Sequence, residues 1–335
     1  MGTVIQTVDL HKNFGRVKAL DGLDLEVHAG EIHGFLGPNG AGKTTTLRIL
    51  LGLARASSGS ATVLDRDPWA HAVELHRRIA SVPGDVNIWP NLSGGETIDL
   101  LSRLRGGTAD HAAYKQRKAR LCETFDFDPT KKGRAYSKGN RQKVALIAAL
   151  ATDAELYLLD EPTSGLDPLM EAVFMREIKR IVHENSATVL LSSHILSEVE
   201  HLADRVSIIR SGRIVDGGTL DSLRHLTRTE ISFSTDSVNT VDTRALARRP
   251  EVHDLAVVDG RVKFGADSDR VHEVLPLLGA LGVKGLLVSP PSLEELFLRH
   301  YGVTVAPRVG EADNATQHDG ATRRQRHPAP EREGA

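Results

Sequence analysis

One segment of the chain has the residue types and spacing of a phosphate-binding loop. Residues 37–44 read Gly-Pro-Asn-Gly-Ala-Gly-Lys-Thr and fit the pattern G-x-x-x-x-G-K-S/T at every fixed position. Glycines let the backbone curl until successive N–H groups point at phosphate oxygens, and a following helix adds its positive N-terminal end. Lys43 can reach the β- and γ-phosphates of a nucleotide, and the hydroxyl of Thr44 can ligate Mg²⁺. A glycine-rich turn without chemical consequence is disfavoured, because an apolar run precedes the segment and a helical pattern follows it.

A nucleotide loop of this kind needs an acidic partner for its metal ion. Residues 156–160 read Leu-Tyr-Leu-Leu-Asp, an apolar run that ends in a carboxylate, and Glu161 follows at once. Successive residues of a strand point in different directions. Asp160 is therefore suited to hold Mg²⁺ together with Thr44, and Glu161 is free to polarise an attacking water. The alternative is an ordinary strand end with two solvated acids.

His194 follows another apolar run, residues 188–192. Ligands of an open parallel sheet gather at the carboxyl ends of its strands, so the strand ends at Leu36, Asp160 and Ser193 are expected to converge on one nucleotide. His194 can then hydrogen-bond an oxygen of the γ-phosphate. The candidate catalytic residues are Glu161, His194 and Lys43. The residues expected to bind the nucleotide in the first segment are Gly37, Pro38, Asn39, Gly40, Ala41, Gly42, Lys43, Thr44 and Thr45.

Short apolar runs alternate with helical patterns over residues 1–222, which predicts an α/β domain with a mainly parallel sheet covered on both faces. A helix is expected at residues 44–53, directly after the phosphate-binding segment. Residues 89–151 lack strand-like runs and predict an inserted helical subdomain, with helices at 97–104, 109–124 and 141–151. The strands are expected at residues 4–10, 23–27, 31–36, 156–160, 188–192 and 205–209.

Residues 223–302 have the pattern of a second, small α+β domain. The order is βαββαβ, which matches a ferredoxin-like unit, and Asp259-Gly260 predicts a hairpin within it. Strands are expected at 229–234, 252–258, 261–264 and 285–288, and helices at 242–247 and 269–281.

Two further segments complete the chain. A stripe of Leu293, Leu296, Phe297 and Tyr301 predicts a last helix that packs on the second domain. Residues 303–335 are poor in large apolar side chains and rich in Arg, Ala, Pro and Glu, so we expect a disordered tail.

Composition limits the functions that the chain can have. The 335 residues include 42 Lys and Arg against 44 Asp and Glu, which excludes a globally basic nucleic-acid binder. The single cysteine, Cys122, excludes an internal disulfide. Because no apolar stretch approaches the ~20 residues of a spanning helix, and because no secretory signal precedes residue 10, any work on a membrane is expected to go through a partner.

Taken together, these residues resemble the ATP-binding subunit of ABC transporters over about residues 3–222. The two segments described above look like the family's Walker A and Walker B motifs. Three further motifs and an aromatic loop match in order along the chain. These are residues 12–15 (aromatic loop, Lys-Asn-Phe-Gly), 136–142 (signature, Tyr-Ser-Lys-Gly-Asn-Arg-Gln), 164–167 (D-loop, Ser-Gly-Leu-Asp) and 193–194 (switch histidine, Ser-His).

The resemblance implies a site shared by two copies of the chain, arranged head to tail. Phe14 would stack on adenine, while Ser137 and Gly139 of one copy would donate hydrogen bonds to the γ-phosphate held by Lys43 of the other. The implied cofactors are ATP and Mg²⁺, and the implied activity is ATP hydrolysis. The expected partners are a second copy and a separate membrane permease, with the chain at the cytoplasmic face of a bacterial membrane.

The sequence departs from the family pattern in two places. The signature has Lys138 where the first glycine is usual, and Asn140 where a glutamine is usual. Gly84 stands where the family has the glutamine of its glutamine loop, and a glycine cannot ligate a metal. Asp85 is the neighbouring group that could substitute.

A decoy lies earlier in the chain. Residues 92–96, Leu-Ser-Gly-Gly-Glu, read closer to the usual signature letters than residues 136–140 do. Ser137, however, lies 23 residues before Asp160 and opens a strongly apolar helix, whereas Ser93 lies 67 residues before it. We therefore predict that Ser93 caps a helix, with Glu96 completing a capping box.

Residues 83–85, 136–139 and 291–297 together look like bacterial exporters of the drug and antibiotic self-resistance type. The expected cargo is a drug, an antibiotic or a lipid-like compound. One alternative is a soluble ABC ATPase that acts on ribosomes or DNA, but the chain has one Walker A motif, no sustained heptads and a near-neutral charge. A P-loop kinase or GTPase would lack the signature and the D-loop.

Overall fold

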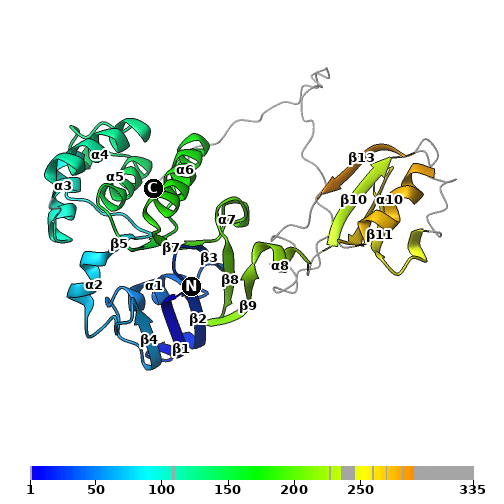
Figure 1. Cartoon of the computed structure of the whole chain (residues 1–335), viewed down its shortest axis with the longest axis horizontal. Helices are drawn as coiled ribbons and strands as arrows, with labels where there is room; N and C mark the ends of the chain where they lie inside the picture. Colours follow the sequence, from blue (N-terminus) through cyan, green and yellow to red (C-terminus); the bar gives the residue numbers. More distant parts are fainter. Residues whose placement is uncertain are drawn as a thin grey trace, which may run out of the picture. The chain divides into compact units, whose positions relative to one another are not determined.

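The computed structural model describes residues 2–107, 110–225, 228–234, 246–258, 260–268, 270–280 and 283–289. A six-stranded sheet forms the centre of residues 2–225, in the order β5-β6-β7-β3-β8-β9 (Figure 1). Its first five strands run parallel, as predicted, and β9 pairs antiparallel to β8. The strands are β3 (Ile32–Leu36), β5 (Ile79–Val82), β6 (Leu156–Asp160), β7 (Thr188–Ser193), β8 (Arg205–Arg210) and β9 (Arg213–Thr219).

The central strands are apolar because both faces of the sheet are covered. Every residue of β3, β6 and β7 is buried. On one face, Leu47 and Leu50 of α1 (Lys43–Leu50) share a core with Phe35 and Leu158. This helix ends earlier than the predicted residue 53, because residues 51–52 form a turn.

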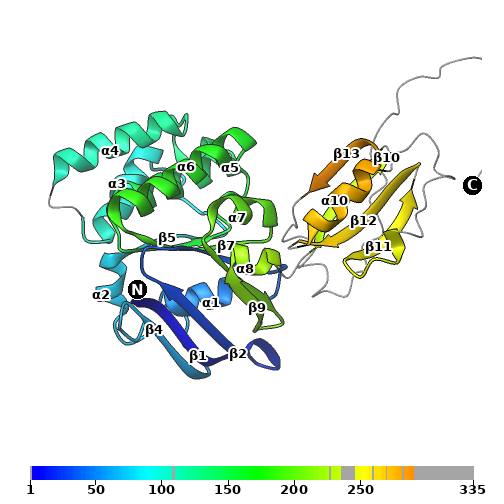
Figure 2. The same cartoon turned by 45° about the vertical axis from the view of Figure 1, so that its right-hand side comes forward.

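A separate three-stranded antiparallel sheet, β2-β1-β4, closes the same core, and α1 lies between the two sheets (Figures 1 and 2). Its strands are β1 (Thr3–Phe14), β2 (Val17–His28) and β4 (Ser58–Val63). The short helix α2 (Ala72–Arg78) leads into β5. The sequence patterns did not predict β4, α2 or β9.

The other face of the central sheet packs against helices. Within their described part, residues 89–151 form helices and no named strand. A core of buried side chains joins Tyr157 and Leu191 of the sheet to Val144, Phe174 and Val199 of the helices. The helices are α3 (Gly94–Leu104), α4 (His111–Thr124), the 3-10 turn η1 (Gly133–Ala135), α5 (Lys138–Leu150), α6 (Pro168–Asn185), α7 (Leu196–Leu202) and α8 (Leu220–His225).

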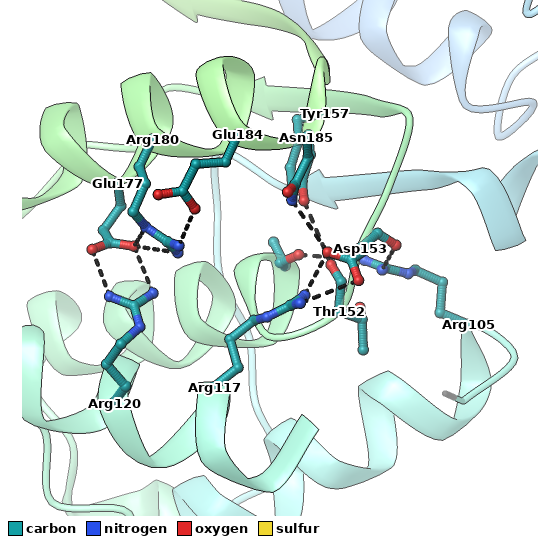
Figure 3. Close-up of polar contacts among 11 residues, drawn as sticks. Arg105, Arg117, Arg120, Thr152, Asp153, Tyr157, Glu177, Arg180, Glu184 and Asn185 are labelled. Carbon is teal, nitrogen blue, oxygen red and sulfur yellow. Dashed lines mark hydrogen bonds and ion pairs between the residues drawn. The ribbon is translucent and has the colours of Figure 1, made fainter. Parts of the chain in front are cut away.

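Two arginines of α4 form ion pairs that connect the helical subdomain to the rest of this fold (Figure 3). Arg120 donates two hydrogen bonds to Glu177 of α6, both at 2.8 Å. Arg117 donates to both carboxylate oxygens of Asp153, at 2.6 and 3.2 Å. Because a bidentate guanidinium–carboxylate pair fixes orientation as well as distance, these contacts restrain α4 against α6 and the start of β6.

The chain after α8 contains a four-stranded antiparallel sheet in the order β11-β12-β10-β13. Its four strands were predicted, and Val258 pairs with Arg261 across the expected hairpin. Helix α10 (Val271–Ala280) supplies Val274 and Leu278 to its core. Of the predicted helix at 242–247 only the last two residues are described, and residues 290–335, including the apolar stripe and the tail, lie outside the described part. The strands are β10 (Arg228–Ser234), β11 (Val252–Val258), β12 (Arg261–Asp267) and β13 (Lys284–Ser289).

Among the helices that the structure describes, none combines the length and the apolar composition needed to cross a membrane.

Candidate nucleotide-binding site

The loop between β3 and α1 has the curled backbone that its glycines predict. Gly40 and Gly42 have φ angles of +83° and +119°, which side chains rarely tolerate. A Cβ on Gly37 would lie 2.6 Å from the carbonyl oxygen of Ile209, so β8 also leaves no room for a side chain there. Two features therefore fix the shape of the loop: the positive φ angles of Gly40 and Gly42, and the close packing of Gly37 against Ile209.

Lys43 opens α1, and its side chain lies back over this loop. Its Nζ atom donates to the carbonyl oxygens of Gly37, at 2.7 Å, and Pro38, at 3.3 Å. The residue is 5 % exposed. A cation that is this buried requires strong acceptors, and phosphate oxygens are better acceptors than carbonyl groups.

The strand ends meet as predicted, because β6, β7 and β3 are successive neighbours in the sheet. In the register of the sheet Asp160 pairs with Ser192, and Leu36 pairs with Ser193. The hydroxyl of Ser192 donates to Asp160 Oδ1 at 2.6 Å. The same hydroxyl accepts from the backbone N–H of Glu161 at 3.1 Å, so Ser192 orients both acidic residues.

Glu161 lies where the candidate catalytic side chains meet. Its Oε1 atom is 3.4 Å from Lys43 Nζ and 3.3 Å from His194 Nδ1. Glu161 has a φ angle of +45°, an uncommon conformation for a residue with a side chain. Strained backbone of this kind persists only where its surroundings enforce it. The three side chains expected to act together are thus brought together.

Most of the remaining residues of the loop are accessible to a ligand. Asn39, Gly40 and Thr44 are exposed, Pro38 and Thr45 are half-buried, and Ala41 is buried. Residues 38–40 and 44 therefore form the accessible rim of the loop.

Phe14 lies at the end of β1 and is 55 % exposed. The Nζ atom of Lys12 lies 4.8 Å from the centroid of its ring, within the range of a cation–π contact. An exposed aromatic face beside a cation suits an electron-rich heteroaromatic ring.

Gly84 brings the backbone after β5 close to the acidic pair. A Cβ at this position would lie 3.2 Å from Asp160 Oδ2. Asp85, the next residue, is exposed and accepts a hydrogen bond from the side chain of Asn87 at 3.2 Å. The proximity of Gly84 to Asp160 is consistent with the place of a glutamine loop, although the glutamine is replaced.

The predicted signature residues lie at the start of α5, against the segment that follows Glu161. Ser137 is the N-cap, and its Oγ accepts from the N–H of Asn140 at 3.3 Å. A Cβ on Gly139 would lie 2.5 Å from the carbonyl oxygen of Gly165, so only glycine fits there. Within the described residues, Ser137 and Gly139 make no hydrogen bond with Lys43, Glu161 or His194.

Two side chains of α5 add to this contact. Both belong to the predicted signature, but the sequence did not predict the hydrogen bonds that they make. Gln142 is 2 % exposed and donates to the carbonyl oxygen of Pro162 at 2.8 Å. Lys138, the residue that departs from the family signature, donates to Ser164 Oγ at 3.0 Å. The first turn of α5 and residues 162–165 therefore form one unit. The signal for these contacts was weak, because they join segments some 20 residues apart by tertiary packing.

The decoy is resolved as predicted. Ser93 is the N-cap of α3, and its Oγ accepts from the N–H of Glu96 at 3.1 Å. The carboxylate of Glu96 accepts in return from the N–H of Ser93 at 2.6 Å. Ser93 thus forms a complete capping box, which accounts for the residues Ser-Gly-Gly-Glu at this place.

Comparisons with known proteins agree with this geometry. The family model described as ABC transporter matches residues 20–164. A bacitracin transport ATP-binding protein of Bacillus licheniformis is 33 % identical over 312 residues, covering 90 % of this chain and 98 % of the relative. A daunorubicin resistance ATP-binding protein of Streptomyces coeruleorubidus is 34 % identical over 316 residues, covering 90 % of this chain and 96 % of the relative.

Solved structures extend the agreement to three dimensions. The ATP-binding subunit of an ABC transporter superposes with a TM-score of 0.62 at 28 % identity, covering 67 % of this chain and 93 % of that one. A dimeric bacterial ABC transporter cassette has the same fold, with a TM-score of 0.58 at 24 % identity, covering 64 % of this chain and 98 % of that one. From its sequence, its fold and its relatives, the chain belongs to the ABC transporter family as an ATP-binding, ATP-hydrolysing subunit.

Proposed function

We propose that residues 37–45 bind the phosphates of ATP with Lys43 as the principal cation. The observation that carries the proposal is the meeting of Lys43, Glu161 and His194 at the ends of adjacent strands. The residues fit the ligand, because the loop is curled by glycines, and because the buried ammonium of Lys43 has two carbonyl groups and one carboxylate as its acceptors among the described residues.

Thr44 and Asp160 are the proposed ligands of Mg²⁺. The described part of the chain contains no group of three His, Cys, Asp or Glu side chains that could hold a metal ion by itself. Phosphate oxygens and water are therefore needed to complete its coordination, as is usual for Mg²⁺. When bound, the ion would neutralise charge on the phosphates. Ser192 supports this role of Asp160 by fixing one of its two oxygens.

The proposed reaction is ATP + H2O → ADP + phosphate. Glu161 orients and polarises the attacking water, and its backbone is held for this by Ser192. Lys43 stabilises negative charge on the phosphates, and His194 donates a hydrogen bond to a γ-phosphate oxygen. His194 Nδ1 lies 3.3 Å from Glu161 Oε1, and this short distance supports the placement of His194 beside the γ-phosphate.

A second copy of the chain is proposed to complete the site. Ser137 and Gly139 lie at the N-terminal end of α5, where backbone N–H groups favour an anion. Within one chain, Lys138 and Gly139 at this helix end contact residues 164–165, and the described residues show no hydrogen bond from Ser137 or Gly139 to Lys43. In the proposed head-to-tail dimer, Ser137 and Gly139 of one copy donate hydrogen bonds to the γ-phosphate held by Lys43 of the other. Phe14 is proposed to stack on the adenine ring, for which its exposed face is suited.

The transport function rests on the relatives. The names of the bacitracin and daunorubicin proteins describe transport or resistance. By analogy, this chain drives export of a drug, antibiotic or lipid-like compound through a separate permease, from the cytoplasmic face of the bacterial membrane. No comparison favours an action on ribosomes or DNA. Residues 223–302 are proposed to be a ferredoxin-like domain, which the order of their four strands supports.

Purification from membranes tests this proposal. Tagged wild-type chain, expressed in a bacterium that carries the neighbouring genes, is solubilised in mild detergent, isolated and assayed for phosphate release. We expect a multispanning membrane protein to co-purify and ATP to be hydrolysed. Co-purification with ribosomes or nucleic acid, without a membrane protein, would contradict the transport function.

A further inference from the structure

Glu198 is a buried carboxyl group to which neither the proposed chemistry nor the family motifs give a role. It lies in α7, four residues after His194, and is 7 % exposed. Its Oε1 atom is buried and has no hydrogen-bond partner in the part of the chain that the structure describes. An acceptor left unpaired in the interior costs free energy, so a group of this kind calls for a specific explanation.

The other oxygen of Glu198 connects two segments of the candidate site. Oε2 accepts hydrogen bonds from Thr163 Oγ1 at 3.0 Å and from Ser193 Oγ at 3.1 Å. Thr163 lies two residues after Glu161, and Ser193 directly precedes His194. One oxygen atom thus links the segment after Glu161 to the strand end before His194.

Both hydroxyl groups are as inaccessible to water as the carboxylate. Thr163 is 6 % exposed and Ser193 is 3 % exposed. Water therefore cannot replace Glu198 as the acceptor of the Thr163 hydroxyl without rearrangement, whereas the Ser193 hydroxyl also lies 3.2 Å from the carbonyl oxygen of Ile195. The carbonyl oxygen of Ser193 also accepts from the N–H of Gly37 at 3.4 Å, so the linked strand end reaches the phosphate-binding loop.

The electrostatics of Glu198 depend on the same neighbours. Burial raises the pKa of Glu198, while the hydrogen bonds from Thr163 and Ser193 lower it in part. Glu171 of α6 raises this pKa further, and His194 lowers it. The pKa of Glu198 is raised overall, because burial outweighs the two hydroxyl groups and His194.

We infer that Glu198 is a positioning residue that makes the segment after Glu161 and the strand end before His194 move as one body. Residues 164 and 165 of that segment also contact the start of α5. A displacement there, when a second copy binds, would thus be transmitted through Thr163, Glu198 and Ser193 to His194. The inference rests on the proposed ATP site and its completion by a second copy.

The experiment compares variants of the full chain in steady-state ATP hydrolysis and in equilibrium binding of ATP. Glu198→Leu keeps the approximate volume and removes the acceptor. Glu198→Gln keeps an acceptor oxygen without the charge, and Thr163→Val removes one donor. Ser197→Ala, at an exposed position of the same helix, is the matched control.

We expect Glu198→Leu to lower kcat about tenfold or more, the rate equivalent of one buried polar group left unpaired, with the Kd for ATP unchanged. Glu198→Gln and Ser197→Ala should retain kcat near that of the wild type. The effects of Thr163→Val and Glu198→Leu should be less than additive in the double variant, because the two residues share one hydrogen bond. A wild-type kcat in Glu198→Leu, or a kcat in Glu198→Gln as low as in Glu198→Leu, would overturn the inference.

Amide hydrogen exchange separates this inference from the proposed function. With ATP and Mg²⁺, slower exchange at residues 37–45 reports nucleotide binding itself. In the wild type, exchange at residues 193–197 should slow as well, whereas in Glu198→Leu only residues 37–45 should respond. If residues 193–197 respond equally in both proteins, Glu198 does not link the segments. If exchange at residues 37–45 does not slow in the wild type, both the proposed function and this inference are contradicted.

Discussion

The ammonium group of Lys43 lies 3.4 Å from Oε1 of Glu161, although the two residues come from opposite sides of β7 in the sheet. The same carboxylate oxygen lies 3.3 Å from Nδ1 of His194. The proposed base is therefore paired with the proposed phosphate ligand. A γ-phosphate that binds Lys43 would compete with Glu161 for the ammonium group. The carboxylate of Glu161 would then be free to accept a hydrogen bond from water.

Removal of the ammonium tests the phosphate-binding role. Lys43→Ala should weaken ATP binding itself, because the cation is buried over the loop and no other lysine or arginine makes a hydrogen bond or ion pair with Glu161 among the described residues. Binding of a fluorescent ATP analogue measures the effect. An unchanged Kd would place the nucleotide phosphates elsewhere.

Two serines separate the signature from its decoy. Ser137→Arg should abolish ATP-driven dimerisation and turnover, because a bulky cation replaces the N-cap where the second copy is expected to bind. Ser93→Ala should only lower the free energy of unfolding, by about 0.5–2 kcal/mol, the usual value of a lost N-cap. Urea unfolding and ATPase assays on both proteins measure these effects. An inactive Ser93→Ala beside an active Ser137→Arg would show that the wrong motif was chosen.

Gly139 is expected to be intolerant of a methyl group. In Gly139→Ala the new Cβ would lie 2.5 Å from the carbonyl oxygen of Gly165, so the start of α5 must move away from that segment. Turnover should fall by about tenfold or more with ATP affinity retained, because a displacement of about 1 Å can misplace a catalytic group. Gly279→Ala is the control, because nothing lies within 4 Å of its Cβ position. Equal turnover in the two variants would refute the steric argument.

The contact between α4 and α6 should make stability sensitive to acid. Burial raises the pKa of Glu177, but the hydrogen bonds and charge of Arg120 and Arg180 outweigh burial and hold this pKa below its ordinary value of 4.5. A carboxyl group with a lowered pKa stabilises the fold above its unfolded-state pKa, and this contribution is lost as the pH falls through its folded-state pKa.

Glu177→Gln should therefore lower the melting temperature at pH 7 and reduce the further loss that the wild type shows below about pH 4.5. Glu184→Gln, which removes a more exposed ion pair with Arg180, should change the melting temperature much less. Thermal unfolding from pH 7 to pH 3.5 distinguishes the two. Parallel curves for the wild type and Glu177→Gln would show that this ion pair does not contribute.

The sequence predicted the elements whose patterns are local. The buried strands ending at Leu36, Asp160 and Ser193 were predicted because fully apolar runs are unmistakable in a covered parallel sheet. The strand β4 was missed because its residues Ser-Gly-Ser-Ala-Thr-Val are small and mostly exposed, without an apolar period. Helix α6 was not predicted either, although Asp167 caps it and Pro168 is its first residue.

The sequence predicted those parts of the candidate site in which a short local motif indicates the role of its residues. The loop at residues 37–44 and the acids at 160 and 161 are readable from spacing alone. The roles of Ser192 and Glu198 were not, because they depend on which strand pairs with β6 and on how α7 turns toward Thr163. Register and helix rotation are set by tertiary packing, and a single sequence does not encode them in a local pattern.

The central claim is that Glu161 activates water while Lys43 binds the phosphates, and Glu161→Gln tests it most directly. Purified wild type and variant are compared for ATP affinity and for phosphate release with Mg²⁺. Because the amide no longer competes for the Lys43 ammonium, the variant should bind ATP at least as tightly as the wild type. Its turnover should fall by about 10²–10⁴-fold, the usual effect of a lost general base. Phosphate release at the wild-type rate by Glu161→Gln would contradict the account.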